Sequence, residues 1–558
     1  MKKLKFLVTL ILALPFFVHA QESKTFTHAD TLRGSLTPER EWWDVMKYDI
    51  SVQPDYNSKT IAASVVISFK ILKNGNRPMQ IDLQDPMIID KVLMNNTSLA
   101  FAKIPGDKNA WFIQTGNHTK GDANITIFYH GKPREAKRPP WDGGWIWTKD
   151  SLGRPWMTVA CQGLGASVWY PCKDYQGDEP DKGAILRIIV PDTLVAVGNG
   201  RLKNTEKKNG LATYTWEVVS PINNYNIIPY IGKYVHWEDT VNGLKGKLDL
   251  QYWALDYDEA RARTQFLQSK TMLHCFEYWF GPYPFYDDSY KLVEAPHLGM
   301  EHQSAVAYGN HFQNGYLGRD LSGTGWGLKW DFIIVHESGH EWFANNITSK
   351  DIADMWIHEG FTNYSESLYT ECMFGKEAGN EYVYGTRKNI HNDIPIIGKY
   401  GVNNEGSGDM YYKSGNMLEA IRHIINDDEL FRSILTGLNK TFYHQTVTTA
   451  DVENFINKKS GINFSKVFDQ YLRTTQIPRF RFYFDKDDKH LTFRWEDCVP
   501  GFDMPLVFTN DNKLQVLTLH PTEKWQTVEL KGNQADFFTG DYIDKNYYVH
   551  TSNENPNN

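Results

Sequence analysis

The sequence predicts a multidomain α+β protein. Its 558 residues exceed what one hydrophobic core accommodates, since a domain averages about 150 residues. Apolar residues recur every second position towards both ends of the chain and at helical spacing in the middle, which indicates two β-rich regions around a helical one. Hydrophobic residues make up 41% of the chain and aromatic residues 14%, so it can fill large cores and is not disordered.

Residues 1–20 are predicted to be a secretory signal peptide. Three lysines precede an apolar run at residues 6–18, and the small residue Ala20 offers a cleavage position. The alternative is an uncleaved membrane anchor. No other stretch approaches the ~18 consecutive apolar residues of a membrane span. We therefore expect an exported protein, periplasmic or extracellular, without stable membrane insertion after cleavage.

Residues 21–245 are predicted to form a β-rich domain. The segments YDISVQ (residues 48–53) and VVISFKIL (residues 65–72) alternate apolar and other side chains, as strands buried on one face do. NITIFYHG and LRIIV continue the pattern, and glycine and proline separate the segments. Such spacing is typical of sheets rather than helices.

Residues 246–476 are predicted to be mainly helical. Apolar side chains from Phe266 to Phe280 recur at helical spacing, and Gly281-Pro282 is a helix stop signal. The pattern returns to a period of two after Pro478, in short segments such as RFRFYF and HLTFRW. Residues 477–558 are therefore predicted to form a small β-sandwich.

The segment HESGHEWFANNITSKDIADMWIHEGF carries the strongest functional signal. His336 and His340 lie about one helical turn apart, so both imidazoles can reach one metal ion, and Glu337 lies beside them. Glu359 follows His340 after 18 intervening residues. Two histidines and one carboxylate leave a coordination position open, which is the arrangement of a catalytic zinc site. The alternative is two buried helices whose histidines have structural roles.

Two further residues flank this carboxylate. His358 lies about 100° round the helix from Glu359 and is not expected to bind the metal. Glu366 lies two turns from Glu359 on the same face. There it either supports a metal ligand by a hydrogen bond or is an ordinary solvated glutamate.

The gluzincin pattern, H-E-x-x-H and then E after 18 residues, is matched by His336, Glu337, His340 and Glu359. Over about residues 40–558 the chain resembles gluzincin metallopeptidases of the aminopeptidase N and leukotriene hydrolase type. The resemblance implies a saddle-like N-terminal domain, a thermolysin-like α/β catalytic domain and one Zn²⁺ per chain. It also implies an exported, bacterial-type member in which the long helical C-terminal domain of many relatives is absent.

Three further motifs of this family occur in the expected order. HLGMEHQS resembles its exopeptidase motif, G-x-M-E-N, and the match assigns substrate binding to Gly299, Met300 and Glu301. ACQGLGASVWYPCKDYQGDEP resembles the element in which a glutamine precedes A/F-P-C-x-D-x-P, and it points to Gln162. DMYYKSG resembles Y-x-K-G and places the catalytic tyrosine at Tyr411, although Tyr412 is an equal candidate from the residues alone.

The chain departs from these motifs at three positions. Leu298 stands where the family usually has the first glycine of the exopeptidase motif, and His302 stands where it has asparagine. Ser414 stands where glycine usually follows the lysine. Because Glu301 is present, recognition of a substrate amine is still expected, and His302 is expected to reshape the first side-chain pocket.

The activity implied by the resemblance is zinc-dependent removal of the N-terminal residue from peptides by attack of a zinc-activated water. Glu337 would be the general base and Tyr411 would stabilise the oxyanion. Glu301 and Gln162 would hold the free α-ammonium group of the substrate. The alternatives are a zinc endopeptidase or an epoxide hydrolase on the same scaffold and, against the intact set of site residues, a non-catalytic binding scaffold.

Charge and cysteine content limit other functions. The net charge of −8, without a long basic run, argues against nucleic acid as a partner. The five cysteines contain no C-x-x-C pair, so a zinc ribbon and a disulfide-rich scaffold are excluded. Buried free thiols are expected, with a disulfide between Cys161 and Cys172 as the alternative.

Overall fold

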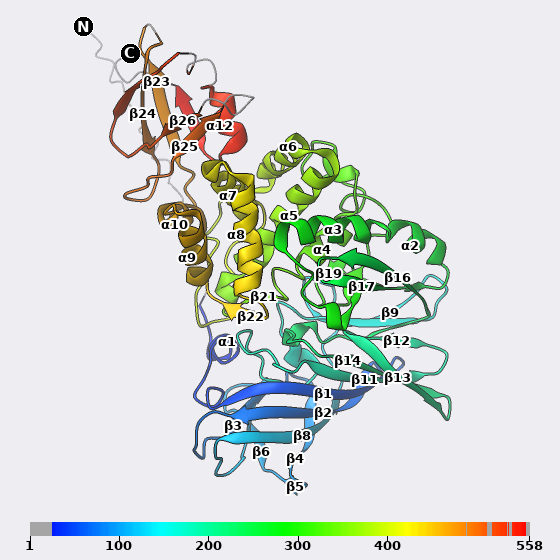
Figure 1. The fold of residues 1–558 in the computed structure, drawn as a ribbon. Coiled ribbons are helices and arrows are strands. Elements are labelled where there is room, and N and C mark those ends of the chain that lie inside the picture. Colours follow the sequence, from blue (N-terminus) through cyan, green and yellow to red (C-terminus); the bar gives the residue numbers. More distant parts are fainter. Residues whose placement is uncertain (1–24, 487, 510–515, 533, 535–537, 554–558) are drawn as a thin grey trace, which may run out of the picture.

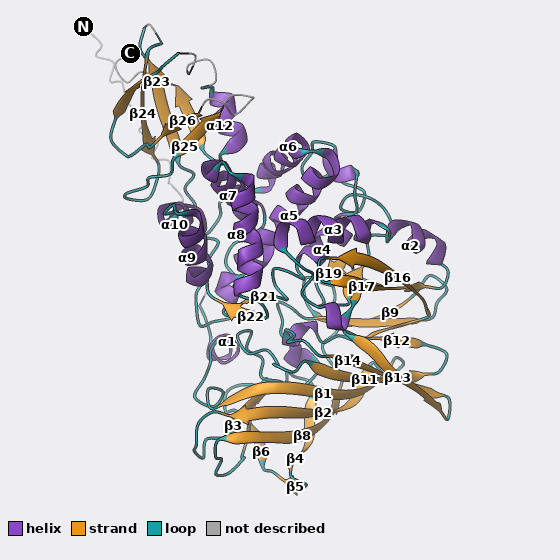
Figure 2. Ribbon diagram, viewed as in Figure 1, coloured by secondary structure: helices purple, strands orange, loops and turns teal. Residues whose placement is uncertain are grey.

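The computed structural model describes residues 25–486, 488–509, 516–532, 534 and 538–553 (Figure 1). The predicted signal peptide, residues 1–20, lies outside these residues. Strands dominate the N-terminal region and the C-terminal unit, and most helices lie between them (Figure 2). The fold is therefore α+β, as the hydrophobic periodicity predicts. No helix in the described part of the chain is long and apolar enough to cross a membrane.

The N-terminal region is built on an eight-stranded sheet of order β13-β14-β11-β1-β2-β8-β4-β5. The predicted strand at residues 48–53 falls on the central strand β1, and residues 65–71 of the second predicted strand fall on β2, which pairs antiparallel with β1. The strands of this sheet are β1 (Trp43–Asp55), β2 (Thr60–Ile71), β4 (Ile88–Met94), β5 (Thr97–Ser98), β8 (Gly121–Gly131), β11 (Ala184–Pro191), β13 (Arg201–Lys208) and β14 (Leu211–Val218).

Two smaller sheets complete this region. One has the order β12-β15-β10-β9 and the other β3-β7-β6. Helix α1 (His28–Gly34) lies between the large sheet and the helical region (Figure 1). The strands are β3 (Met79–Asp82), β6 (Phe101–Lys103), β7 (Ala110–Ile113), β9 (Gly144–Lys149), β10 (Pro155–Ala160), β12 (Val195–Val197) and β15 (Tyr230–Gly232).

The middle region begins with a five-stranded sheet of order β16-β17-β18-β20-β19, so β19 is an edge strand. Its strands are β16 (Tyr234–Gly243), β17 (Gly246–Leu255), β18 (Tyr290–Glu294), β19 (Gly299–Met300) and β20 (Val306–Tyr308). Helices α2 (Glu259–Gln265) and α3 (Gln268–Phe280) follow β17, and α3 ends at Gly281, whose φ of 92° suits glycine.

Helix α5 is the centre of the helical region. It is buried from Trp356 to Thr370 and packs against α3, α4, α6 and α7. A helix surrounded in this way excludes water from any polar group it carries. The elements are α4 (Phe332–Gly339), α5 (Trp356–Phe374), α6 (Lys376–Thr386), α7 (Tyr412–Ile425), α8 (Asp428–Thr441), α9 (Thr449–Ser460), α10 (Ser465–Arg473), and the parallel strands β21 (Ile347–Ser349) and β22 (Gln445–Val447).

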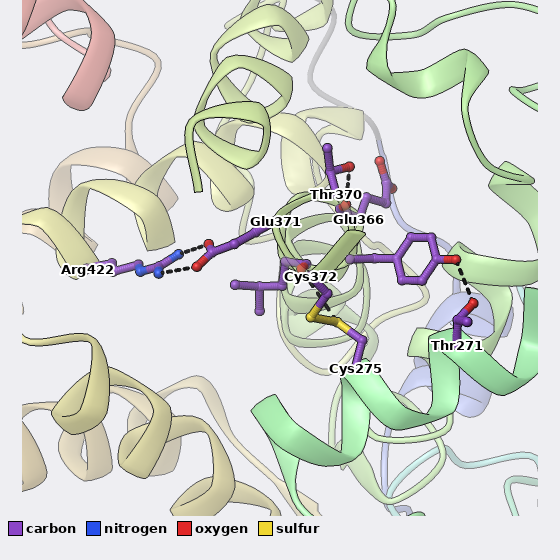
Figure 3. Close-up of a disulfide and its surroundings, with 9 residues drawn as sticks. Thr271, Cys275, Glu366, Thr370, Glu371, Cys372 and Arg422 are labelled. Carbon is purple, nitrogen blue, oxygen red and sulfur yellow. Dashed lines mark hydrogen bonds and ion pairs between the residues drawn. A yellow bond between two sulfur atoms is a disulfide. The ribbon is translucent and has the colours of Figure 1, made fainter. Parts of the chain in front are cut away.

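A disulfide joins α3 to the C-terminal end of α5 (Figure 3). It links Cys275 to Cys372, with a Cα–Cα distance of 6.1 Å and a sequence separation of 97. The alternative pairing of Cys161 with Cys172 is wrong, because both are buried free thiols. The expectation of free thiols is also wrong for Cys275 and Cys372. These two residues are far apart in the sequence and meet only because α3 packs against α5.

The C-terminal unit contains two sheets, of order β27-β24-β23-β28 and β25-β26, and helix α12 (Gly540–Asn546). The two sheets share an aromatic core, in which the ring of Phe538 lies 4.7 Å from Phe508 and 6.4 Å from Phe480. Helix α12, which the sequence pattern did not indicate, packs against α6 and α7. The strands are β23 (Arg479–Phe484), β24 (His490–Glu496), β25 (Leu506–Thr509), β26 (Val516–Leu519), β27 (Gln526–Glu529) and β28 (His550–Asn553).

Candidate active site

Helix α4 carries the two predicted metal-binding histidines. Its N-cap is the buried Asp331, whose Oδ1 accepts hydrogen bonds from the backbone N–H groups of Ile333 and Ile334 at 3.0 and 3.3 Å. The Tyr308 hydroxyl and the Asn310 amide also donate to this carboxylate. The start of α4 is thus tied to β20 and to the loop after it, and this places the helix beside the sheet edge.

The structure brings His336, His340 and Glu359 together. Glu359 Oε2, on α5, lies 3.3 Å from His340 Nε2 and 3.7 Å from His336 Nε2. The three potential ligand atoms all lie within 4.8 Å of one another. In the described part of the chain, the other group of three such residues contains Glu301, Glu337 and His340, so it adjoins the first.

The other ring nitrogens of the two histidines are held by the protein. His336 Nδ1 lies 2.8 Å from Glu366 Oε1, and His340 Nδ1 lies 3.0 Å from the carbonyl oxygen of Phe343. Of the two alternatives for Glu366, the structure therefore shows the supporting hydrogen bond. His358 points elsewhere, as expected, because its Nε2 accepts the backbone N–H of Ser349 at 2.8 Å.

This donor set fits a zinc ion. Glu359 Oε2 is buried, yet within the part of the chain that the structure describes it makes no hydrogen bond. Burial disfavours the charged carboxylate, but His340 and His336 more than offset this and lower the pKa of Glu359. An ionised carboxylate and two imidazoles whose Nε2 atoms face one point are ligands that Zn²⁺ prefers.

Glu337 lies against the edge strand β19. A Cβ atom added at Gly299 would lie 2.6 Å from Glu337 Oε1 and 2.9 Å from Ile333 Cγ2, so only glycine permits this approach. Gly299, predicted to bind substrate, thus also makes room for Glu337. Burial raises the pKa of Glu337 to about 7.

A second cluster surrounds Glu301. Its Oε1 accepts hydrogen bonds from Gln162 Nε2 at 2.7 Å and from the Tyr225 hydroxyl at 3.1 Å. Glu301 and Gln162, predicted from separate motifs, therefore meet, and burial raises the pKa of Glu301. Tyr225 was missed by the sequence analysis, because it lies in INNYNIIPY, where no motif distinguishes it from a core tyrosine.

Tyr411 lies beside His336. Its ring stacks near that of His336, with a centroid distance of 6.0 Å and an interplanar angle of 24°. Tyr412 starts α7 and also lines the cavity described next, so both candidates face the site. Because its ring contacts that of His336, a predicted zinc ligand, Tyr411 is favoured over Tyr412 as the residue that stabilises the oxyanion.

The departures from the family motifs differ in position. Leu298 lines the active-site cavity. His302 is fully buried and bonds through Nδ1 to the Tyr230 hydroxyl, and it is not among the described residues that line the cavity. An effect of His302 on the first side-chain pocket would therefore be indirect, through its neighbours. Ser414 packs against Gly360. A Cβ atom added to Gly360 would lie only 2.5 Å from the Cβ atom of Ser414.

A cavity of about 550 Å³ connects the predicted zinc ligands with Glu301 and Tyr411. Met300, which was predicted to bind substrate, lies on its wall, and Trp141 projects at its rim with 69% of its surface exposed. Among the described residues that line it there are five glutamates but no lysine, arginine or aspartate. The wall therefore favours a positively charged group inside the cavity. The glutamates are Glu301, Glu337, Glu359, Glu366 and Glu405.

The helical region matches a known protein family. Residues 268–471 match the family model described as Peptidase family M1 domain. These residues form a peptidase family M1 domain. Helices α4 and α5, which supply the metal cluster of His336, His340 and Glu359, lie within this M1 domain, and so do β19 and Tyr411. Gln162 and Tyr225 come from the N-terminal region.

Relatives of the chain include named aminopeptidases. Probable aminopeptidase 2 of Sulfurisphaera tokodaii is 20% identical over 434 residues, which cover 73% of this chain and 52% of the relative. Mouse aminopeptidase B is 23% identical over 363 residues, 60% of this chain and 52% of the relative. Leukotriene A-4 hydrolase of Xenopus laevis is 21% identical over 445 residues, 75% of this chain and 68% of the relative. The chain thus spans about half the length of the first two.

Solved structures share the fold beyond the M1 domain. The M1 zinc metallopeptidase of Deinococcus radiodurans superposes with a TM-score of 0.63 at 19% identity, over 78% of this chain and 94% of that protein. A mutant of that enzyme bound to a Tyr-Ser-Ala substrate gives the same TM-score and 78% coverage of this chain. The similarity shows that the N-terminal β-rich region and the M1 domain occur together in another protein.

Proposed function

We propose that this protein is a zinc-dependent aminopeptidase that removes the N-terminal residue from peptides. One observation carries the proposal: the Glu301 cluster and the metal cluster share one cavity, and ligand atoms of Glu301, Glu337 and His340 lie within 4.8 Å of one another. A carboxylate beside the reaction centre can hold a free α-ammonium group one residue from the bond that breaks. The M1 domain and the names of the relatives support the same activity.

His336, His340 and Glu359 would hold the zinc ion, which when bound acidifies water and polarises the scissile carbonyl group. Glu337 removes a proton from the attacking water, whose oxygen joins the carbonyl carbon. The C–N bond then breaks, and Glu337 returns the proton to the leaving nitrogen. A carboxylate whose pKa burial raises to about 7 suits both transfers near neutral pH. Tyr411 donates a hydrogen bond to the carbonyl oxygen as it becomes negative.

The position of Glu301 favours an aminopeptidase over an endopeptidase. Gln162 and Tyr225 donate to one carboxylate oxygen of Glu301 and orient it. A chain that extended past the α-nitrogen would place an uncharged amide against a buried carboxylate, which is costly. Peptides with a free N-terminus should therefore bind best, whereas the same clamp has no evident use in a non-catalytic scaffold.

Kinetics on a panel of aminoacyl-coumarin substrates test the proposal. Replacing Glu301 with alanine should lower kcat/KM by roughly 10²–10³-fold, because a buried ammonium group loses its counter-charge. Glu238→Ala, on the exposed part of β16, is the matched control and should retain wild-type kinetics. A chelator should abolish turnover and zinc should restore it. Equal turnover without Glu301, or efficient cleavage of N-acetylated peptides, would contradict the aminopeptidase assignment.

Export from the cytoplasm is part of the proposal. The signal-peptide pattern of residues 1–20 supports it, and so does the Cys275–Cys372 disulfide, since such bonds persist mainly in oxidising compartments. Mass spectrometry of the protein purified from an expressing bacterium should find a mature chain that begins at Gln21. A full-length chain recovered only from the cytosolic fraction would contradict export.

A further inference from the structure

The wall of the active-site cavity has an apolar part that the proposed mechanism does not use. The rings of Tyr316 and Phe332 pack edge to face at 5.3 Å, and Ile333 lies against Gly299 of β19. We call the six apolar or aromatic residues of this part the apolar wall: Leu298, Tyr316, Leu321, Phe332, Ile333 and Tyr412.

The segment that carries Glu301 places the apolar wall at the far end of the substrate path. Leu298 precedes Gly299–Met300, which form strand β19, and Glu301 follows it. Three residues of extended chain span ~10 Å. The Cα atom of the second substrate residue lies ~5 Å from the ammonium nitrogen, and a large side chain on it extends further. A peptide that lies along this edge strand with its ammonium group at Glu301 therefore brings the side chain of its second residue towards Leu298.

Helix α4 independently indicates the same course for the substrate, from Glu301 towards the apolar wall. His340, at its C-terminal end, lies beside Glu301, whereas Phe332 starts the helix eight residues earlier. Eight residues of α-helix rise ~12 Å. Glu337 lies between these two ends. A substrate with its amine near His340 and its scissile bond near Glu337 thus continues towards Phe332 and Ile333.

We propose that the apolar wall binds the side chain of the second substrate residue, the one that follows the scissile bond. The enzyme therefore selects peptides whose second residue is large and apolar or aromatic, and Leu298 is a specificity-determining residue. An acidic second residue is disfavoured, because the described cavity lining contains glutamates and no cationic side chain except the histidines. This inference rests on the proposed aminopeptidase function and names its substrate class.

Tripeptides that differ only at the second position test this selection. The first residue is the best one from the coumarin panel, the third is alanine, and the second is Gly, Asp, Leu or Phe. We expect kcat/KM to be at least tenfold higher for Leu and Phe than for Gly, because an apolar side chain leaves water. Leu298→Gly and Tyr316→Ala should each reduce the Phe-to-Gly ratio to about threefold or less. Leu152→Ala, on an exposed loop outside the cavity, should retain the wild-type ratio.

The outcomes separate the inference from the proposed function. If no tripeptide and no coumarin substrate is hydrolysed, both fail. If tripeptides are hydrolysed with all four second residues within threefold of one another, the aminopeptidase function stands and the apolar-wall proposal is overturned. A wild-type Phe-to-Gly ratio in both the Leu298 and the Tyr316 variants overturns it as well. Using two variants guards against a folding defect in one of them.

Discussion

Replacing Cys275 and Cys372 together with alanine should lower the free energy of unfolding by about 4 kcal/mol. The disulfide spans a sequence separation of 97, and the entropy of closing a loop of that length corresponds to ~4.7 kcal/mol at 25 °C. Residual structure in the unfolded chain reduces this value, so about 3–5 kcal/mol is expected. The change also releases the end of α5, the helix that supplies Glu359 and Glu366 (Figure 3).

Urea unfolding followed by tryptophan fluorescence measures this effect. The wild type, the double alanine variant and Cys498→Ala, a partly exposed free thiol, are each compared with and without a reductant. Reductant should shift the wild type and the Cys498 variant towards the double variant and leave the double variant unchanged. A double variant within about 1 kcal/mol of the oxidised wild type would refute the loop-entropy argument.

Two further predictions concern buried carboxylates. Glu366→Gln should weaken zinc binding about 10–100-fold, because His336 loses a charged hydrogen-bond acceptor. Competition with a chromophoric chelator measures the zinc affinity. An unchanged affinity would count against a supporting role for Glu366. Burial raises the pKa of Glu179 from 4.5 to about 8, although Thr348 donates to it at 2.6 Å. The folded state therefore holds this proton, and stability is lost as pH rises from about 4.5 through 8. At pH 9 the free energy of unfolding of Glu179→Gln, measured in urea, should exceed that of the wild type by up to ~4 kcal/mol. This difference in free energy should nearly vanish at pH 4.5. The same difference at both pH values would contradict the raised pKa of Glu179.

Much of the fold could be predicted because its causes are local. Alternation within residues 48–53 indicated a strand, since side chains two positions apart share a face of any sheet. The four-residue spacing of His336 and His340 already placed both rings on one side of α4. The departure at Leu298 could be noted from the sequence, but its place on the cavity wall could not, because burial of a loop residue depends on what packs against it.

Other parts of the site required contacts between distant segments. Tyr225 donates to Glu301 across 76 residues and Gln162 across 139, so neither hydrogen bond leaves a periodic signal in the chain. The same holds for His302, which lies between β19 and β20, whereas its partner Tyr230 lies on β15. A motif predicted that Gln162 and Glu301 have functional roles, whereas packing decided which groups each side chain contacts.

The sequence by itself determined the α+β organisation, the residues of the metal cluster and the carboxylate expected to hold the substrate amine. Each of these follows from spacing along a few turns or strands, or from a short motif. Only the tertiary structure decided that Cys275 pairs with Cys372, that Tyr225 supports Glu301 and that an apolar wall lies beyond Glu337. These features arise where helices and sheets from separate regions meet, and the interactions that select them act through space rather than along the chain.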